Sequence, residues 1–200
     1  ADDYEGILEI GRHQAESGAH LLDVCVALTE RPDEADQMRT LVKLLAQSVE
    51  TPLMIDTTEA NVVEAALKQY PGRATINSIH LENGRARIEA VLPHAVEHGA
   101  ALVALTIDEQ GMAKTAERKL EVARRIHDIT TREYGLQPDA LIFDDLTFTL
   151  ATGDAEFRRS AIESNDSTTP EIHTLPRHVA LLILPTTPFS WRTDARAVLN

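Results

Sequence analysis

The chain alternates short apolar runs with longer segments in which apolar residues recur at helical spacing. The apolar runs have the length of buried strands and read HLLDVCV, PLMID, RATINSI, ALVALTID, ALIFD and HVALLIL. Between them, residues 34–49, 58–70 and 114–134 predict amphipathic helices, and Gly135 ends the third as a C-cap. The expected apolar faces of the first and third helices comprise Met38, Leu41, Val42, Leu45 and Val49, and Leu120, Ala123, Ile126 and Ile129. This alternation predicts β/α units that form a parallel sheet.

A polar side chain stands at or near the carboxyl end of each of the first five predicted strands. These side chains are Asp23, Asp56, Asn77, Asp108 and Asp144. Each one alone is equally consistent with capping the following helix. Five in register indicate a shared site, because the strand ends of a β/α barrel meet at one mouth where active sites form. Acids without neighbouring Lys or Arg favour a ligand that presents hydrogen-bond donors. An open doubly wound sheet would normally carry a glycine-rich phosphate loop, and this sequence has none.

Composition narrows the classes of protein to which the chain can belong. Its 200 residues are 43% hydrophobic and 26% charged, which suits one globular domain with its own core. A formal net charge of −13 argues against a nucleic-acid partner, because phosphate binding depends on Lys and Arg. The aliphatic runs are far shorter than the roughly 20 residues of a membrane span. A single cysteine, Cys25, cannot form an internal disulfide and fits a cytoplasmic setting.

Several other residues suggest chemistry but are better explained without it. His94 and a second histidine four residues later have the spacing of helical metal ligands, but no third ligand is nearby, so we expect no metal site. Cys25 is expected to be a small buried strand residue rather than a nucleophile, because no histidine motif accompanies it. The charged run AERKLEVARR is interpreted as a solvated helix face. Asp108 and Glu109, within IDEQGM, are weaker candidates for ligand contact.

Five segments occur in a recognisable order and spacing. They read GAHLLDVCVALTERPDEADQM, PLMIDTTEANVVEAALK, ATINSIHLENG, HGAALVALTIDEQGMAKTAERKLEVARRIHDI and LIFDDLTFTLATG. From about residue 3 to residue 163, the chain resembles the pterin-binding family and, within it, the methyltetrahydrofolate domain of cobalamin-dependent methionine synthase. The wider family includes methyltetrahydrofolate:corrinoid methyltransferases and dihydropteroate synthases. The resemblance implies a TIM-type (β/α)8 barrel whose mouth holds the pterin.

The same resemblance implies one pterin-binding barrel domain over residues 1–200, in which residues 164–193 are atypical. There the expected helix is replaced by SNDSTTPEIHTLPRHVA, a composition typical of a loop. Genuine divergence and a sequence error both remain open as explanations. The family's first strand, with its ERxN type motif, is missing before Ala1, and nothing after Asn200 forms the last strand. We therefore expect an incomplete barrel that is a fragment of a larger protein.

The resemblance implies that Asp56, Asn77 and Asp144 are the pterin-binding side chains. The pyrimidine edge of a reduced pterin pairs a ring N–H with an amino group, and one carboxylate can accept from both. We assign this edge to Asp144. Asn77 can both donate to the ring and accept from it, and Asp56 can accept from another ring N–H. Three such contacts would hold the flat ring so that its methyl group lies in line with an incoming nucleophile.

The resemblance also implies a reaction, the transfer of the N5-methyl group of 5-methyltetrahydrofolate to the cob(I)alamin of a corrinoid domain or protein during methionine synthesis. N5 must then acquire a proton or a strong hydrogen bond, and in the family an Asn of a GxSNxS motif interacts with it. Here Pro185 and Thr186 occupy the places of that Ser and Asn, so no catalytic residue is assigned. Two alternatives stay open: a non-catalytic or truncated pterin-binding module, and a dihydropteroate synthase-like enzyme. The second is weakened because no Ser-Thr-Arg-Pro loop is present.

Overall fold

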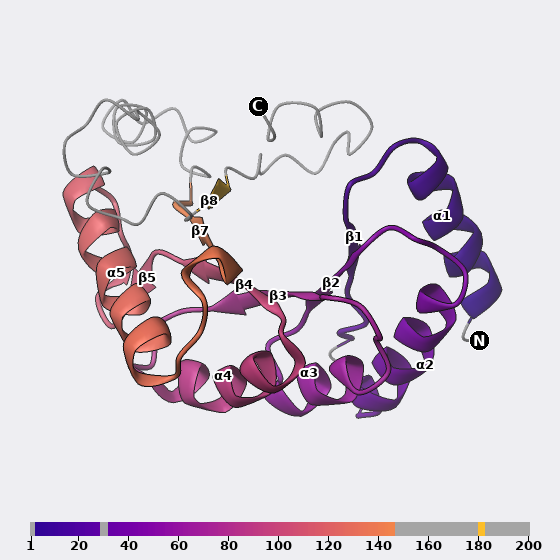
Figure 1. Cartoon of the computed structure of the whole chain (residues 1–200), viewed down its shortest axis with the longest axis horizontal. Helices are drawn as coiled ribbons and strands as arrows, with labels where there is room; N and C mark the ends of the chain where they lie inside the picture. The colour runs from indigo at the N-terminus through magenta and orange to yellow at the C-terminus, as the bar shows by residue number, and fades with distance from the viewer. Residues whose placement is uncertain (1–2, 29–31, 147–179, 183–200) are drawn as a thin grey trace. The chain divides into compact units, whose positions relative to one another are not determined.

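The computed structural model describes residues 3–28, 32–146 and 180–182 of the chain. The chain divides into two compact units, which are described separately here (Figure 1). Unit 1 consists of residues Ala1–Ser78 and Pro93–Ala101. Unit 2 consists of residues Ile79–Leu92 and Leu102–Asn200. No helix in the described ranges is both long and apolar enough to cross a membrane.

Unit 1 alternates helices and strands. Its elements are α1 (Tyr4–Glu16), β1 (Leu22–Val24), α2 (Glu34–Ala46), β2 (Leu53–Asp56), α3 (Ala60–Leu67), nearly all of β3 (Thr75–Ile79) and the second half of α4 (Ala86–His98). The strands are parallel and lie in the order β1-β2-β3. Helix α2 packs between α1 and α3 (Figure 1). Each parallel pair is therefore joined by a helix, as the β/α pattern predicted.

The core of unit 1 follows from the alternation of side chains along its strands. Leu53, Ile55 and Ile76 are buried on one face, and successive residues of a strand point to opposite faces. Helix α2 buries the predicted residues Met38, Leu41, Val42 and Leu45. It ends at Ala46, earlier than predicted, so Val49 is only half-buried and lies outside the helix.

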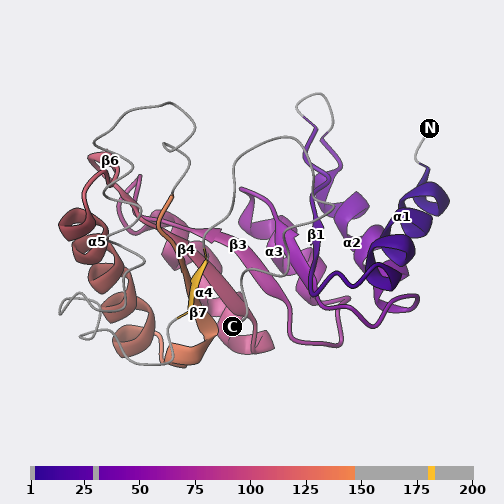
Figure 2. The same ribbon diagram turned by 90° about the horizontal axis from the view of Figure 1, so that it is seen from above.

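Unit 2 combines a second set of parallel strands with an antiparallel hairpin. Its elements are the first half of α4, β4 (Ala101–Leu105, from Leu102), β5 (Ile107–Asp108), β6 (Gly111–Met112), α5 (Ala116–Asp128), the π-helical turn η1 (Ile129–Glu133), the 3-10 turn η2 (Pro138–Ala140), β7 (Leu141–Asp144) and β8 (Ala180–Leu182). Strand β7 lies between β4 and β8, and all three are parallel. The β5–β6 hairpin lies beside α5 (Figure 2). Gly111, the first residue of β6 directly after the hairpin turn, has a φ of 92°, which favours glycine.

The apolar runs predicted the described parallel strands of both units, and the α/β class with parallel strands is confirmed. Gly135 has a φ of 71° and follows η1, as expected for a C-cap glycine. Helices α1 and α4 and strand β6 were not predicted. The run ALVALTID is two strands rather than one, because Thr106 separates β4 from β5 and donates its N–H to the Asp144 carbonyl, 3.1 Å away.

Two further expectations are wrong. Cys25 is exposed and follows β1 instead of lying buried within it. The run AERKLEVARR is not simply a solvated face, because Lys119 is buried on α5 together with Val122, Ala123 and Ile126. These positions have the spacing i, i+3, i+4 and i+7 of a helix face that packs against a core. The buried face therefore begins at Lys119, one residue before the predicted Leu120.

Candidate functional site

In unit 1, polar side chains occupy one face of the parallel strands at their carboxyl ends. Asp56 ends β2 and lies opposite Asn77 of β3 in the strand register. Asp23 of β1 pairs with Met54, two residues before Asp56, so its side chain points to the same face. Asp56 and Asn77 are half-buried, and Asp23 is exposed. The structure thus brings two of the three predicted pterin ligands, Asp56 and Asn77, to neighbouring positions, with Asp23 close to them.

The loop after β2 is fixed by the hydroxyl group of Thr57. This hydroxyl donates to Oε1 of Glu34 at 2.6 Å and accepts the N–H of Glu59 at 3.1 Å. The Thr57 N–H donates to the carbonyl of Asn77 at 3.2 Å. Thr57 is not the N-cap residue of α3, because Glu59 holds that position. The contacts of Thr57 instead connect the end of β2 to β3 and to α2. They therefore restrict the backbone next to Asp56.

The two acids of this face affect one another. Although Asp23 is partly exposed, the protein atoms around its carboxyl group displace water and raise its pKa to about 6, and the nearby Asp56 carboxylate adds to the effect. Burial also raises the pKa of Asp56. No cation among the described residues lowers either pKa, so both carboxyls favour their neutral forms more than free acids do. Such a pair is suited to ring N–H donors, because a hydrogen bond from a ligand would compensate the carboxylates for lost water.

In unit 2, Asp144 ends β7 and is held at several points. It lies opposite Leu105 in the register of β4 and β7. Its carbonyl accepts the N–H and the hydroxyl of Thr106, at 3.1 and 3.3 Å. One carboxylate oxygen accepts the N–H of Leu146 at 2.8 Å. The residue is 6% exposed, and burial is the main cause of its raised pKa, with Asp145 raising it further and Leu146 and Lys119 lowering it. The Asp144 carboxylate is thus held in place through one oxygen, and its second oxygen remains as a further hydrogen-bond acceptor.

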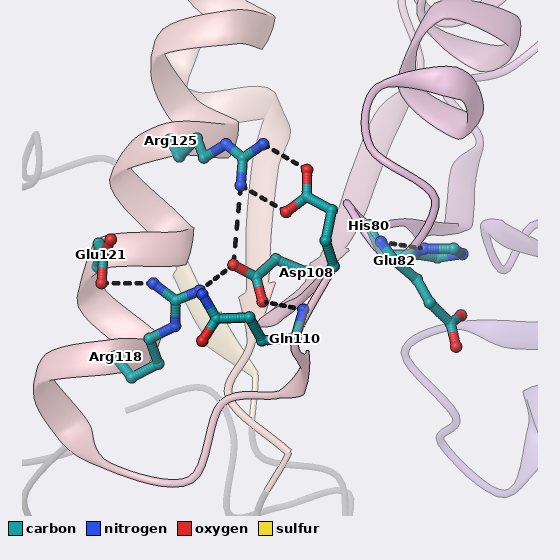
Figure 3. A network of polar contacts seen from close by, with 8 residues as sticks. His80, Glu82, Asp108, Gln110, Arg118, Glu121 and Arg125 are labelled. Atoms are coloured by element: carbon teal, nitrogen blue, oxygen red, sulfur yellow. Dashed lines mark hydrogen bonds and ion pairs between the residues drawn. The ribbon is translucent and has the colours of Figure 1, made fainter.

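Asp108, a weaker candidate, has protein partners of its own (Figure 3). Its side chain is 3% exposed and forms an ion pair with Arg118 of α5, and Arg125 lies 3.7 Å away. It also accepts the N–H of Gln110 at 3.1 Å. Glu109 forms two hydrogen bonds with Arg125, at 2.6 and 2.7 Å. These acids therefore connect the β5–β6 hairpin to α5, and the expectation that acids at strand ends have no nearby cation is wrong for Asp108.

Within the described residues, we assign no further site to the remaining candidates from the sequence. A cavity of about 310 Å³ lies between the hairpin and the start of α5, but none of the three predicted pterin ligands lines it. His98 places its Nδ1 3.0 Å from the carbonyl of His94, the interaction of a helix side chain with its own backbone. No group of three or more His, Cys, Asp or Glu residues in the described part of the chain could hold a metal ion. Pro185 and Thr186 lie outside the described residues.

Parallel β/α units whose strands end in polar side chains are typical of α/β proteins that bind a ligand at the carboxyl ends of the strands. A family model for pterin binding enzymes matches residues 1–176, and the chain belongs to this family. The predicted family is thereby confirmed.

Within this family, the chain is similar to methionine synthases. It is 40% identical over 203 residues to the methionine synthase of Mycobacterium tuberculosis (strain ATCC 25618 / H37Rv). It is 41% identical over 203 residues to that of Mycobacterium leprae (strain TN). Each match covers 100% of this chain, and the chain spans 17% of the length of each relative.

Solved structures of dihydropteroate synthases have a similar fold. The Yersinia pestis enzyme with a pterine-sulfa conjugate has a TM-score of 0.59 and 15% identity, covering 91% of this chain and 68% of that one. The enzyme from Vibrio fischeri ES114 has a TM-score of 0.53 and 17% identity, covering 75% and 63%. At these identities the likeness shows the fold alone. It confirms an α/β fold with parallel strands of the TIM-barrel type, of which this chain carries a part.

The raised pKa of Asp23 predicts a pH-dependent stability. A carboxyl whose pKa rises on folding stabilises the fold fully below its ordinary pKa of 3.8, and this contribution is lost as the pH rises to about 6. Asp23→Asn stays neutral throughout, so its advantage over the unmodified chain should grow between pH 4 and pH 7. Because Asp23 is exposed, we expect a gain of only about 0.5 to 1 kcal/mol at pH 7.

Urea unfolding of both chains across this pH range measures the difference. Glu9→Gln, which neutralises an exposed acid on α1 in the same unit, is the matched control. A difference between Asp23→Asn and the unmodified chain that stays constant from pH 4 to pH 7 would show that Asp23 does not titrate as described.

Proposed function

We propose that this chain binds 5-methyltetrahydrofolate through Asp56, Asn77 and Asp144 and presents the N5-methyl group to the cob(I)alamin of a corrinoid domain or protein. The observation that carries the proposal is the 40% identity to a methionine synthase along the whole chain. Membership of the pterin-binding family supports a pterin as the ligand. A cytoplasmic setting, suggested by the single cysteine, belongs to the same proposal.

The geometry within each unit is consistent with this assignment. Asp56 and Asn77 are neighbours in register at the ends of β2 and β3, and Asn77 offers both a donor and an acceptor. Asp144 has one carboxylate oxygen bound to Leu146 N–H and further acceptor capacity for a pterin. In the proposed complex, Asp144 accepts from the pyrimidine edge, and the other two side chains contact the rest of the ring.

The chemistry of the proposed step is a displacement at the methyl carbon. A cob(I)alamin on the partner would supply the nucleophile that receives the methyl group, and the electron pair of the broken carbon–nitrogen bond would stay on N5, which would take up a proton. The chain contributes mainly by position, because it would hold the ring with the methyl group facing the cobalt. The group that interacts with N5 is not assigned, since Thr186 stands in the family's Asn position and lies outside the described residues.

Two alternatives compete with this function. A non-catalytic pterin-binding module is favoured by the replacement of Ser and Asn by Pro185 and Thr186. A dihydropteroate synthase-like enzyme shares the fold, but the identity to its solved structures is only 15 to 17%. The methionine synthase relatives are the more similar, so we propose methyl transfer first.

Replacement of Asp144 tests the binding site. Asp144→Asn puts an N–H donor opposite the N–H donors of the pterin and leaves them unpaired, at a cost of about 1 to 3 kcal/mol. Calorimetric titration with 5-methyltetrahydrofolate should therefore show an affinity weaker by about 5- to 150-fold. Asp139→Asn, an exposed acid shortly before β7, is the matched control and should bind like the unmodified chain. Equal affinities for Asp144→Asn and the control would remove Asp144 from the site.

Replacement of Thr186 separates transfer from binding alone. If Thr186 leaves N5 without an adequate donor, the chain should bind the folate but methylate free cob(I)alamin slowly, since loss of such a donor costs about 10²-fold or more. Thr186→Asn, with Pro185→Ser if the backbone requires it, should raise the rate and leave the affinity nearly unchanged. Stopped-flow absorbance of cob(I)alamin measures the rate. Rapid transfer by the unmodified chain would contradict the expectation and point to another proton source.

A further inference from the structure

The proposed pterin contacts do not use the cavity of about 310 Å³ in unit 2, which lies between the β5–β6 hairpin and the start of α5. Its lining includes Gln110 and Met112 of the hairpin, and Lys114, Thr115 and Arg118 around the helix start. Small-molecule sites typically measure about 300 to 1,000 Å³, so this cavity is at the lower end of that range. It therefore suits one part of a folate rather than a whole folate.

Polar contacts within the chain hold both walls of this cavity in place (Figure 3). Asp108 of the hairpin forms an ion pair with Arg118 of α5 and accepts the N–H of Gln110 at 3.1 Å. On the other wall, Thr115 is the N-cap of α5, and its hydroxyl accepts the N–H of Arg118 at 3.2 Å. Because these contacts attach the hairpin to the helix, binding in the cavity would require little ordering of the protein.

Two backbone hydrogen bonds connect the cavity to Asp144. Ala113, which also lines the cavity, donates its N–H to the carbonyl of Thr106 at 3.0 Å. Thr106 in turn donates its N–H to the carbonyl of Asp144 at 3.1 Å. Hydrogen-bonded backbone segments lie about 5 Å apart, so the backbone of Ala113 lies roughly 10 Å or less from that of Asp144. The cavity and Asp144 are therefore both at the carboxyl ends of β4 and β7.

The lining of the cavity combines apolar and polar groups. Met112 is half-buried and offers a thioether, which packs well against aromatic rings. Gln110 is exposed, and its amide can both donate and accept hydrogen bonds. The charge of Arg118 is balanced by Asp108, whereas Lys114 adds a positive charge at an exposed position. This lining suits an aromatic ring that carries an amide and ends in a carboxylate.

We propose that this cavity binds the p-aminobenzoyl-glutamate tail of the folate, with the aromatic ring against Met112, the amide beside Gln110 and the carboxylates towards Lys114. The inference rests on the proposed function, because it takes the folate to be held by Asp144. The tail is attached to the pyrazine ring of the pterin, on the side away from the pyrimidine edge. The offset between Asp144 and the cavity is therefore in keeping with the extended shape of a folate.

Two ligands that differ in the tail test this site. 5-Methyltetrahydrofolate carries the tail, and 5,6-dimethyltetrahydropterin has a methyl group in its place and keeps the reduced ring with its N5-methyl group. In calorimetric titrations, the unmodified chain should bind the folate about tenfold or more tightly than the pterin. Met112→Ala should weaken folate binding about three- to tenfold through loss of the sulfur–ring contact, and should change pterin binding by less than about twofold.

A second variant and two comparisons make the test specific. Gln110→Ala removes one hydrogen bond at an exposed position, so it should fold even if Met112→Ala does not, and should weaken folate binding alone by about two- to tenfold. Gln137→Ala, at an exposed position before η2 in the same unit, is the matched control and should bind both ligands like the unmodified chain. Asp144→Asn should instead weaken both ligands by the same factor, because it acts on the ring that they share.

The outcomes separate the inference from the function on which it rests. Equal affinities of the unmodified chain for the two ligands would overturn the tail site and leave the proposed function standing. The same conclusion would follow if Met112→Ala and Gln110→Ala bound the folate like the unmodified chain, or if they weakened both ligands equally. If the unmodified chain binds neither ligand, the proposed function is wrong and the inference fails with it.

Discussion

Parallel strand pairing in register is the constraint on which the candidate site depends. It places Asp56 opposite Asn77 in unit 1 and Asp144 opposite Leu105 in unit 2. Because side chains alternate along a strand, a slip of one residue would turn each polar group to the opposite face. The register that buries Leu53 and Ile55 in the core of unit 1 thus also presents Asp56 at the carboxyl end of the sheet. The same alternation of side chains sets the packing of the core and the face on which Asp56 lies.

The acids at the strand ends differ in what compensates their charge. Asp108 is neutralised by arginines of α5 and contributes to the attachment of the hairpin. Asp23, Asp56 and Asp144 have pKa values that burial raises, and only Asp144 has a described cation that opposes the rise. A carboxylate without a strong protein partner is the kind of group that a ligand with N–H donors can satisfy. The electrostatic differences therefore separate structural acids from candidate binding acids.

Much of the fold could be predicted from the sequence, because short apolar runs and helical spacing report directly on local structure. The polar strand ends were visible for the same reason. The ion pair of Asp108 with Arg118 could not be predicted, since it depends on how the hairpin packs against α5. Lys119 was missed because the buried face of α5 starts one residue earlier than its apolar residues suggest. The signal in the sequence was the helical spacing of Lys119 from Val122, Ala123 and Ile126, which places it on the apolar face of the helix.

The central claim is that one reduced pterin contacts Asp56, Asn77 and Asp144 together. A crystal structure of the chain bound to 5-methyltetrahydrofolate tests this claim most directly. The account predicts that the Asp144 carboxylate lies within hydrogen-bond distance of the ring N–H and amino group of the pyrimidine edge, and that Asp56 and Asn77 contact the same ring. A pterin bound away from these strand ends would contradict it.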